Sequence, residues 1–216
     1  MKISEPMTLF TDYALALLTL FWGIRLLRLG EHDQQISKLL WGLGFLATAS
    51  ASLLGGAFHG FRLHLSDLFA VFLWKASVYF VGLASLFMLS AMVLICTKPS
   101  WRYWALGIVA LKFLVFTIWM IGHSEFRFVI YDYALAMIVI FLLQIYVGVN
   151  HRAKSAAWIV GGVLIGLAGG AIQMKKISLH EYFNHNDLFH VMQMAAFYLF
   201  YRGGKWLEIF NSERKP

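Results

Sequence analysis

Long apolar runs alternate with short polar segments along this chain, and their lengths predict helices that cross a membrane. An α-helix rises about 1.5 Å per residue, so about 20 apolar residues span the roughly 30 Å of hydrocarbon in a bilayer. Runs of this kind occupy residues 7–29, 38–59, 67–96, 102–122, 127–149, 155–174 and 187–206. The pattern predicts an all-α membrane protein in which seven transmembrane helices form a single domain.

The composition supports this prediction and excludes an ordinary soluble domain. Hydrophobic residues make up 60% of the 216 residues, charged residues make up 13%, and the mean hydropathy is +0.70. A net charge of +7 could suggest nucleic acid, but the Lys and Arg residues lie between apolar runs, as membrane topology requires. We therefore expect no nucleic-acid partner. The single cysteine, Cys96, excludes an intramolecular disulfide and a metal site built from cysteines.

The distribution of basic residues predicts the orientation. The first run lacks a small-residue cleavage site, so we interpret it as a retained span and not as a cleaved leader. Eleven basic residues fall on one side of the predicted bundle and five on the other, and the richer side is expected in the cytoplasm. The eleven are Arg25, Arg28, Lys38, Lys98, Arg102, Arg152, Lys154, Arg202, Lys205, Arg214 and Lys215; the five are Lys2, Arg62, Arg127, Lys175 and Lys176. The N-terminus is then outside and the C-terminus cytoplasmic, and we expect a bacterial inner membrane.

Three short matches in the same order indicate an internal repeat. They pair Thr11–Ala16 with Tyr131–Ala136, Gly55–Ala57 with Gly169–Ala171, and Ser66–Phe69 with Asn186–Phe189. The two halves, residues 7–96 and 127–206, would each contribute three helices, and residues 102–122 would link them. This 3+1+3 arrangement makes the halves parallel, as in some membrane transport proteins whose sites lie between repeats.

Six ionisable residues are predicted to share one layer near the outer surface: Asp12, His59, Asp67, Asp132, Asp187 and His190. Ionisable groups within spans are costly, so such a layer suggests a site. A structural role is the alternative for the aspartates, because carboxylates are favoured at helix N-termini. Lys75 and Lys112 also lie inside apolar runs, where we expect them to pair with an acidic group or a lipid phosphate, or to line a polar cavity.

The histidines differ between the two halves, which favours a functional role. His59 corresponds to Gln173 in the repeat, and His190 corresponds to Ala70. Imidazole is the commonest metal ligand, and zinc suits a site of His nitrogens with a carboxylate and an open position for water. We therefore predict a zinc site at His59 and His190, completed by His185 or Asp187. The alternative is that both histidines only form hydrogen bonds at the interface.

A histidine at the end of the second run, an aspartate at the start of the third and a histidine in the seventh together resemble the CREST superfamily of seven-helix membrane hydrolases. That superfamily includes alkaline ceramidases, Per1 proteins and progestin and adipoQ receptors. The resemblance implies a zinc ligand at His59, a second at His190, and a role for Asp67 in supporting zinc-bound water. Asn186 and Gly55 stand where the superfamily has a histidine and a serine, and Ser52 is the nearest substitute for that serine.

The sequence thus predicts a zinc-dependent hydrolase that acts on a lipid amide or ester, with Asp67, Asp12 and Ser52 as catalytic residues. Asp12 and Asp132 would line the cavity or support the metal ligands. The alternative is a seven-helix transporter or receptor that binds a small ligand or a proton in the same layer. A structural subunit with a vestigial site is a third possibility.

Overall fold

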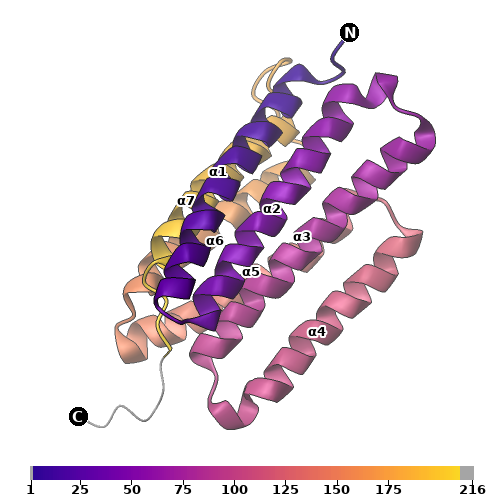
Figure 1. Cartoon of the computed structure of the whole chain (residues 1–216). Coiled ribbons are helices and arrows are strands. Elements are labelled where there is room, and N and C mark those ends of the chain that lie inside the picture. Colours follow the sequence, from indigo (N-terminus) through magenta and orange to yellow (C-terminus); the bar gives the residue numbers. More distant parts are fainter. Residues whose placement is uncertain (1, 210–216) are drawn as a thin grey trace.

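A computed structural model describes residues 2–209, which fold into seven α-helices without a β-strand (Figure 1). The helices are α1 (Pro6–His32), α2 (Ile36–Phe61), α3 (Asp67–Cys96), α4 (Pro99–Gly122), α5 (Phe126–His151), α6 (Lys154–Met174) and α7 (His185–Gly204). A short 3₁₀ turn, Arg62–His64, links α2 to α3. Each predicted run lies within one helix, except that the last run extends two residues beyond α7.

Six of the helices within the described part of the chain, α1 to α6, are long and apolar enough to cross a membrane. The chain therefore has the build of a multi-pass integral membrane protein. Helix α7 is the exception because its first turns carry Asn186, Asp187, His190 and Gln193. The same polar residues that make α7 less apolar also bring acid–base groups into the bundle.

Six helices pack in a ring, and α4 lies outside it. In sequence order, α1 packs on α2, α2 on α3, α5 on α6 and α6 on α7. The ring closes because α1 contacts α7 and α3 contacts α5. Helix α4 packs along α3 at the edge of the bundle (Figure 1). This places α4 as a peripheral link between two three-helix sets; the parallel repeat itself stays a prediction.

One end of the bundle is tightly packed. We call it the closed end; α1, α3, α5 and α7 finish there, and α2 and α6 begin there. Its core contains Trp41, Phe45, Met92, Ile140 and Phe200, all fully buried. The Trp41 indole donates a hydrogen bond to the carbonyl oxygen of Phe200 at 3.1 Å, so α2 and α7 are held together at this end. The opposite end, where α1, α3, α5 and α7 begin, is the open end.

The two lysines inside the apolar runs both fasten α4. Lys112 on α4 donates to Asp132 Oδ1 on α5 at 2.6 Å and to Ser85 Oγ on α3 at 2.8 Å. Lys75 on α3 donates to the carbonyl oxygens of Met120 and His123, at the C-terminal end of α4. Lysine ammonium groups near a helix C-terminus are favoured by the helix dipole. The contact with Asp132 confirms the expectation of an acidic partner for Lys112, whereas Lys75 contacts backbone carbonyl oxygens.

We expect Lys112→Ala to destabilise the protein by about 3–5 kcal/mol, because it leaves the buried Asp132 carboxylate without its cation. Unfolding in detergent, followed by circular dichroism, measures the change. The matched control is Lys98→Ala, which removes an exposed lysine just before α4. The double variant Lys112→Met, Asp132→Leu should recover most of the loss, since it removes both charges. Equal stability of Lys112→Ala and Lys98→Ala would show that the ion pair contributes nothing.

Candidate active site

A cavity of about 720 Å³ lies inside the six-helix ring. All six ring helices contribute lining residues, and within residues 2–209 none comes from α4. The polar part of its wall includes Asp12, Ser52, His59, His190 and Gln193. Its size lies within the range of about 300–1,000 Å³ that is typical of small-molecule sites.

The cavity extends from the open end to just past the middle of the bundle. Its mouth is lined by Glu125, Arg127, Lys176 and His185, which lie at the ends of α5, α6 and α7. Its deeper wall is mostly apolar: it is formed by Leu15, Val81, Ala84, Met88 and Phe197, together with Thr48 and Ser85. Below these residues lies the packed core of the closed end. The cavity therefore has a polar entrance, a polar wall and an apolar floor.

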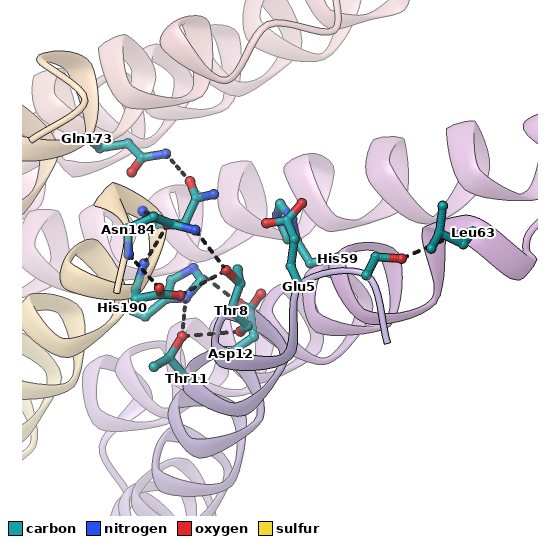
Figure 2. A network of polar contacts seen from close by, with 12 residues as sticks. Glu5, Thr8, Thr11, Asp12, His59, Leu63, Gln173, Asn184 and His190 are labelled. Carbon is teal, nitrogen blue, oxygen red and sulfur yellow. Dashed lines mark hydrogen bonds and ion pairs between the residues drawn. The ribbon is translucent and has the colours of Figure 1, made fainter. Parts of the chain in front are cut away.

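Asp12 and His190 come together from opposite ends of the chain. His190 Nε2 lies 3.3 Å from Asp12 Oδ1, and His190 Nδ1 lies 3.0 Å from Thr11 Oγ1 (Figure 2). Both side chains are almost completely buried, with 4% of Asp12 and 9% of His190 exposed. The prediction that these two residues share one layer is confirmed, and the structure shows that they are in contact.

The hydrogen bonds around His190 place a proton between the imidazole and Asp12. The Thr11 hydroxyl also lies 3.2 Å from the Thr8 carbonyl oxygen. If Thr11 donates to that carbonyl, the Thr11 oxygen accepts a hydrogen bond from His190 Nδ1–H. His190 Nε2 then either accepts a proton from a protonated Asp12 or carries a proton itself, which makes the ring an imidazolium. If Thr11 instead donates to Nδ1, Nε2–H donates to Asp12. In each arrangement Asp12 and His190 share one proton, as an acid–base pair does.

Asp187 is a structural residue of the α7 N-terminus. Its Oδ1 accepts a hydrogen bond from Thr8 at 2.8 Å, and its Oδ2 accepts one from the Asn184 backbone N–H at 2.7 Å. Asn184 Oδ1 in return accepts from the backbone N–H of Asp187 at 3.4 Å, which completes a capping box, and also from that of Asn186 at 2.7 Å. Both Asp187 oxygens therefore accept a hydrogen bond. The N-terminal role of Asp187 is realised, and its role as a metal ligand stays a prediction.

His59 forms a second imidazole–carboxylate contact near the mouth. Its Nδ1 lies 3.2 Å from Glu5 Oε2 (Figure 2). Its ring packs edge-on against Phe58 and Trp74. The segment before α1 is fixed there because Ser4 N–H donates to the Gly60 carbonyl oxygen. His59 beside it lowers the pKa of Glu5 below its ordinary value. Glu5, Thr8 and Thr11 are site residues that the sequence patterns did not single out.

The remaining predicted residues divide between the cavity and the surface. Ser52 is buried and, like His185, lines the cavity. Asn186 lines it too and accepts a hydrogen bond from Gln173 at 2.7 Å. Asp67 is not brought to the site: its side chain is 93% exposed and pairs with Arg62 at 2.9 Å. It is the first residue of α3, and Ser66 caps that helix.

The donors that line the cavity do not form a ready metal centre. Among residues 2–209, no group of three His, Cys, Asp or Glu side chains is positioned to hold a metal ion. His59, His190 and Asp12 are donors of the kind that zinc takes, but His190 has both ring nitrogens in contact with Asp12 and Thr11. The zinc site therefore stays a prediction.

Comparison with known protein families gives one match, the family of unknown function DUF6962, over residues 7–208. The chain belongs to this family. No curated protein and no solved structure matches it. The DUF6962 match begins inside α1 and ends beyond α7, so it covers the whole cavity-forming bundle and includes Asp12, His59 and His190. Glu5 lies just before the matched range.

We expect Glu5→Gln to lower stability slightly in a pH-dependent way. A lowered pKa in the folded state means that ionised Glu5 stabilises the fold above its ordinary pKa, and that this stabilisation is lost as the pH falls through the folded-state pKa. The difference in unfolding free energy between wild type and Glu5→Gln should thus be full at neutral pH, begin to fall near the ordinary Glu pKa of about 4.3, and vanish once the pH is below the lowered folded-state pKa. Glu31→Gln, an exposed residue at the far end of α1, is the control. A difference that persists unchanged in acid would contradict the Glu5–His59 contact.

Proposed function

We propose that this protein is an integral-membrane hydrolase that acts on a lipid amide or ester. The observation that carries the proposal is the Asp12–His190 pair on the wall of a cavity with a polar entrance and an apolar floor. A shared proton between carboxylate and imidazole is the arrangement that general acid–base catalysis uses. The apolar floor supplies the hydrophobic surface on which a lipid acyl chain can be buried.

In this proposal the substrate enters with its acyl part toward Leu15, Met88 and Phe197. Its polar part then lies beside Asp12 and His190, and the head group reaches the mouth near Arg127 and Lys176. The reacting carbonyl would lie at the level of the polar wall. Burying the acyl chain supplies binding free energy in proportion to the apolar area removed from water, and it fixes the depth of the scissile bond.

The Asp12–His190 pair would act on water. Asp12 accepts a proton from a water molecule as the water oxygen attacks the carbonyl carbon, and His190, whose ring nitrogens contact Thr11 and Asp12, positions the carboxylate. The tetrahedral intermediate then collapses: the C–N or C–O bond breaks, and the proton passes from Asp12 to the leaving nitrogen or oxygen. The products are a carboxylic acid and an amine or alcohol. Ser52 is the buried hydroxyl on the cavity wall that can donate to the carbonyl oxygen.

Zinc remains part of the proposal through the resemblance to CREST hydrolases, with its own test. Bound zinc would polarise the carbonyl and lower the pKa of water. If zinc belongs to the site, the purified protein should contain one zinc per chain, and the double variant His59→Ala, His190→Ala should lose it. Full activity of metal-free protein would leave Asp12 and His190 as the catalytic groups.

The topology belongs to the same proposal. We propose that α7 crosses the membrane as the seventh span, because it packs between α6 and α1 inside the ring. The excess of basic residues at the closed end places that end in the cytoplasm. The cavity mouth then faces outward. A transporter is less well supported, because among the described residues no lining residue comes from α2 before Thr48 or from α7 after Phe197, and the packed core of the closed end lies beyond them.

We expect hydrolysis of single-chain amide or ester lipids by the protein in nanodiscs, measured as released fatty acid by mass spectrometry. Asp12→Asn and His190→Gln should each lower the rate by about 10²–10⁴-fold, because each removes the acid–base pair. Asp67→Asn should leave the rate unchanged, since Asp67 lies on the surface. An equal rate in Asp12→Asn and Asp67→Asn would refute the assigned mechanism.

A further inference from the structure

Asp12 has one carboxylate oxygen without a partner. Oδ1 faces His190, but among the described residues Oδ2 has no hydrogen-bond donor, although it is buried. A buried carboxylate oxygen without a donor has lost its hydration without a replacement, which is unfavourable. Asp12 lines the cavity, so a group that occupies the cavity is the natural source of the missing donor.

The second copy of the same motif shows what such an aspartate takes as a partner. Asp132 stands where Asp12 stands in the matching segments Thr11–Ala16 and Tyr131–Ala136. Asp132 is also largely buried, and it receives the Lys112 ammonium group at 2.6 Å. Lys112 belongs to α4, which lies between the two predicted halves in the sequence. The chain thus supplies a cation to Asp132 and a histidine to Asp12.

The other charges around the cavity do not compensate Asp12. Arg127 at the mouth pairs with Glu125 at 3.1 Å. Lys176 lies in the segment after α6, at the level of the mouth. The contacts of the described Asp12 side chain include no lysine or arginine. Among the described residues, Asp12 is therefore the acidic residue on the cavity wall that no lysine or arginine contacts.

A glycine leaves space beside this carboxylate. A Cβ placed on Gly55 would lie 3.6 Å from both Asp12 oxygens and 3.3 Å from Ser77 Oγ. Gly55 and Ser77 both line the cavity. Gly55 thus brings the α2 backbone close to the Asp12 carboxylate, with room for little more than a methyl group between them.

We propose that the cavity binds an amphipathic ligand whose ammonium group takes the place at Asp12 that Lys112 takes at Asp132. The inference rests on the proposed function, and it assigns the substrate class: a lipid amide or ester whose polar part carries a protonated amine. The ammonium donates to Asp12 Oδ2 while Oδ1 orients His190, and the apolar part lies on the floor. Charge-assisted hydrogen bonds are about twice as strong as neutral ones, so the site should select an amine over an alcohol of equal length.

The test is binding of dodecylamine and of dodecanol, each measured by equilibrium dialysis against protein in nanodiscs of zwitterionic diacyl lipid. Empty nanodiscs of the same lipid correct for partition into the bilayer. We expect the wild type to bind the amine about tenfold or more tightly than the alcohol, which corresponds to one charge-assisted contact. Asp67→Asn, the surface control, should keep this preference, and Asp12→Asn should lose it.

A second variant covers the case in which Asp12→Asn does not fold. Gly55→Ser keeps the carboxylate but places a hydroxyl within reach of it, so Asp12 gains a donor from the chain. The amine preference should fall several-fold in Gly55→Ser. Equal affinity for amine and alcohol in the wild type, or an unchanged preference in both Asp12→Asn and Gly55→Ser, would overturn the proposal.

Binding does not require turnover, so this test and the hydrolysis assay fail separately. Amine preference without hydrolysis would support the ligand class and remove the hydrolase. Hydrolysis of neutral lipids by a protein with no amine preference would support the hydrolase and overturn the ligand class.

Discussion

Ionisable side chains buried in an apolar bundle need partners, and in this protein the contacts that supply those partners also hold the helices together. Lys112 and Asp132 fasten the peripheral α4 to the ring. Lys38 at the start of α2 contacts Asp33 in the turn from α1. The Asp12–His190 pair joins α1 to α7 and so closes the ring. Breaking any of these pairs would leave a charge in a poorly solvated environment, which costs more than the intact pair contributes.

The structure also shows why the two halves differ in chemistry despite their matching motifs. The Asp132 carboxylate is neutralised by a lysine that the chain itself provides, so that copy is purely structural. The Asp12 carboxylate meets an imidazole, a weaker and titratable partner, on the wall of a cavity. Within residues 2–209 the helix that supplies the lysine, α4, lies outside the two predicted halves. If the repeat is real, this additional helix accounts for the different partners of the two matching aspartates.

Hydrophobic periodicity and length predicted the helices closely, because a span needs a minimum number of apolar residues whatever its neighbours are. Asp12 and His190 could also be assigned to one layer, since depth follows from position along a span. The direction in which each side chain points could not be predicted from the sequence. Asp67 turns outward to Arg62, and Asp187 is occupied by Thr8 and Asn184. Glu5, Thr8 and Thr11 have no periodic signal, and their roles depend on contacts with residues far away in the sequence.

The ring has a consequence for how the protein is made. Its closing contact joins the first helix to the last, so Asp12 and its partner His190 are separated by almost the entire chain. During synthesis Asp12 enters the membrane long before His190 leaves the ribosome. Until then the carboxylate must remain protonated, hydrated or shielded by the insertion machinery. The cavity is accordingly the last part of the molecule to form, and a chain truncated before α7 has five of the six helices that line it and no acid–base pair.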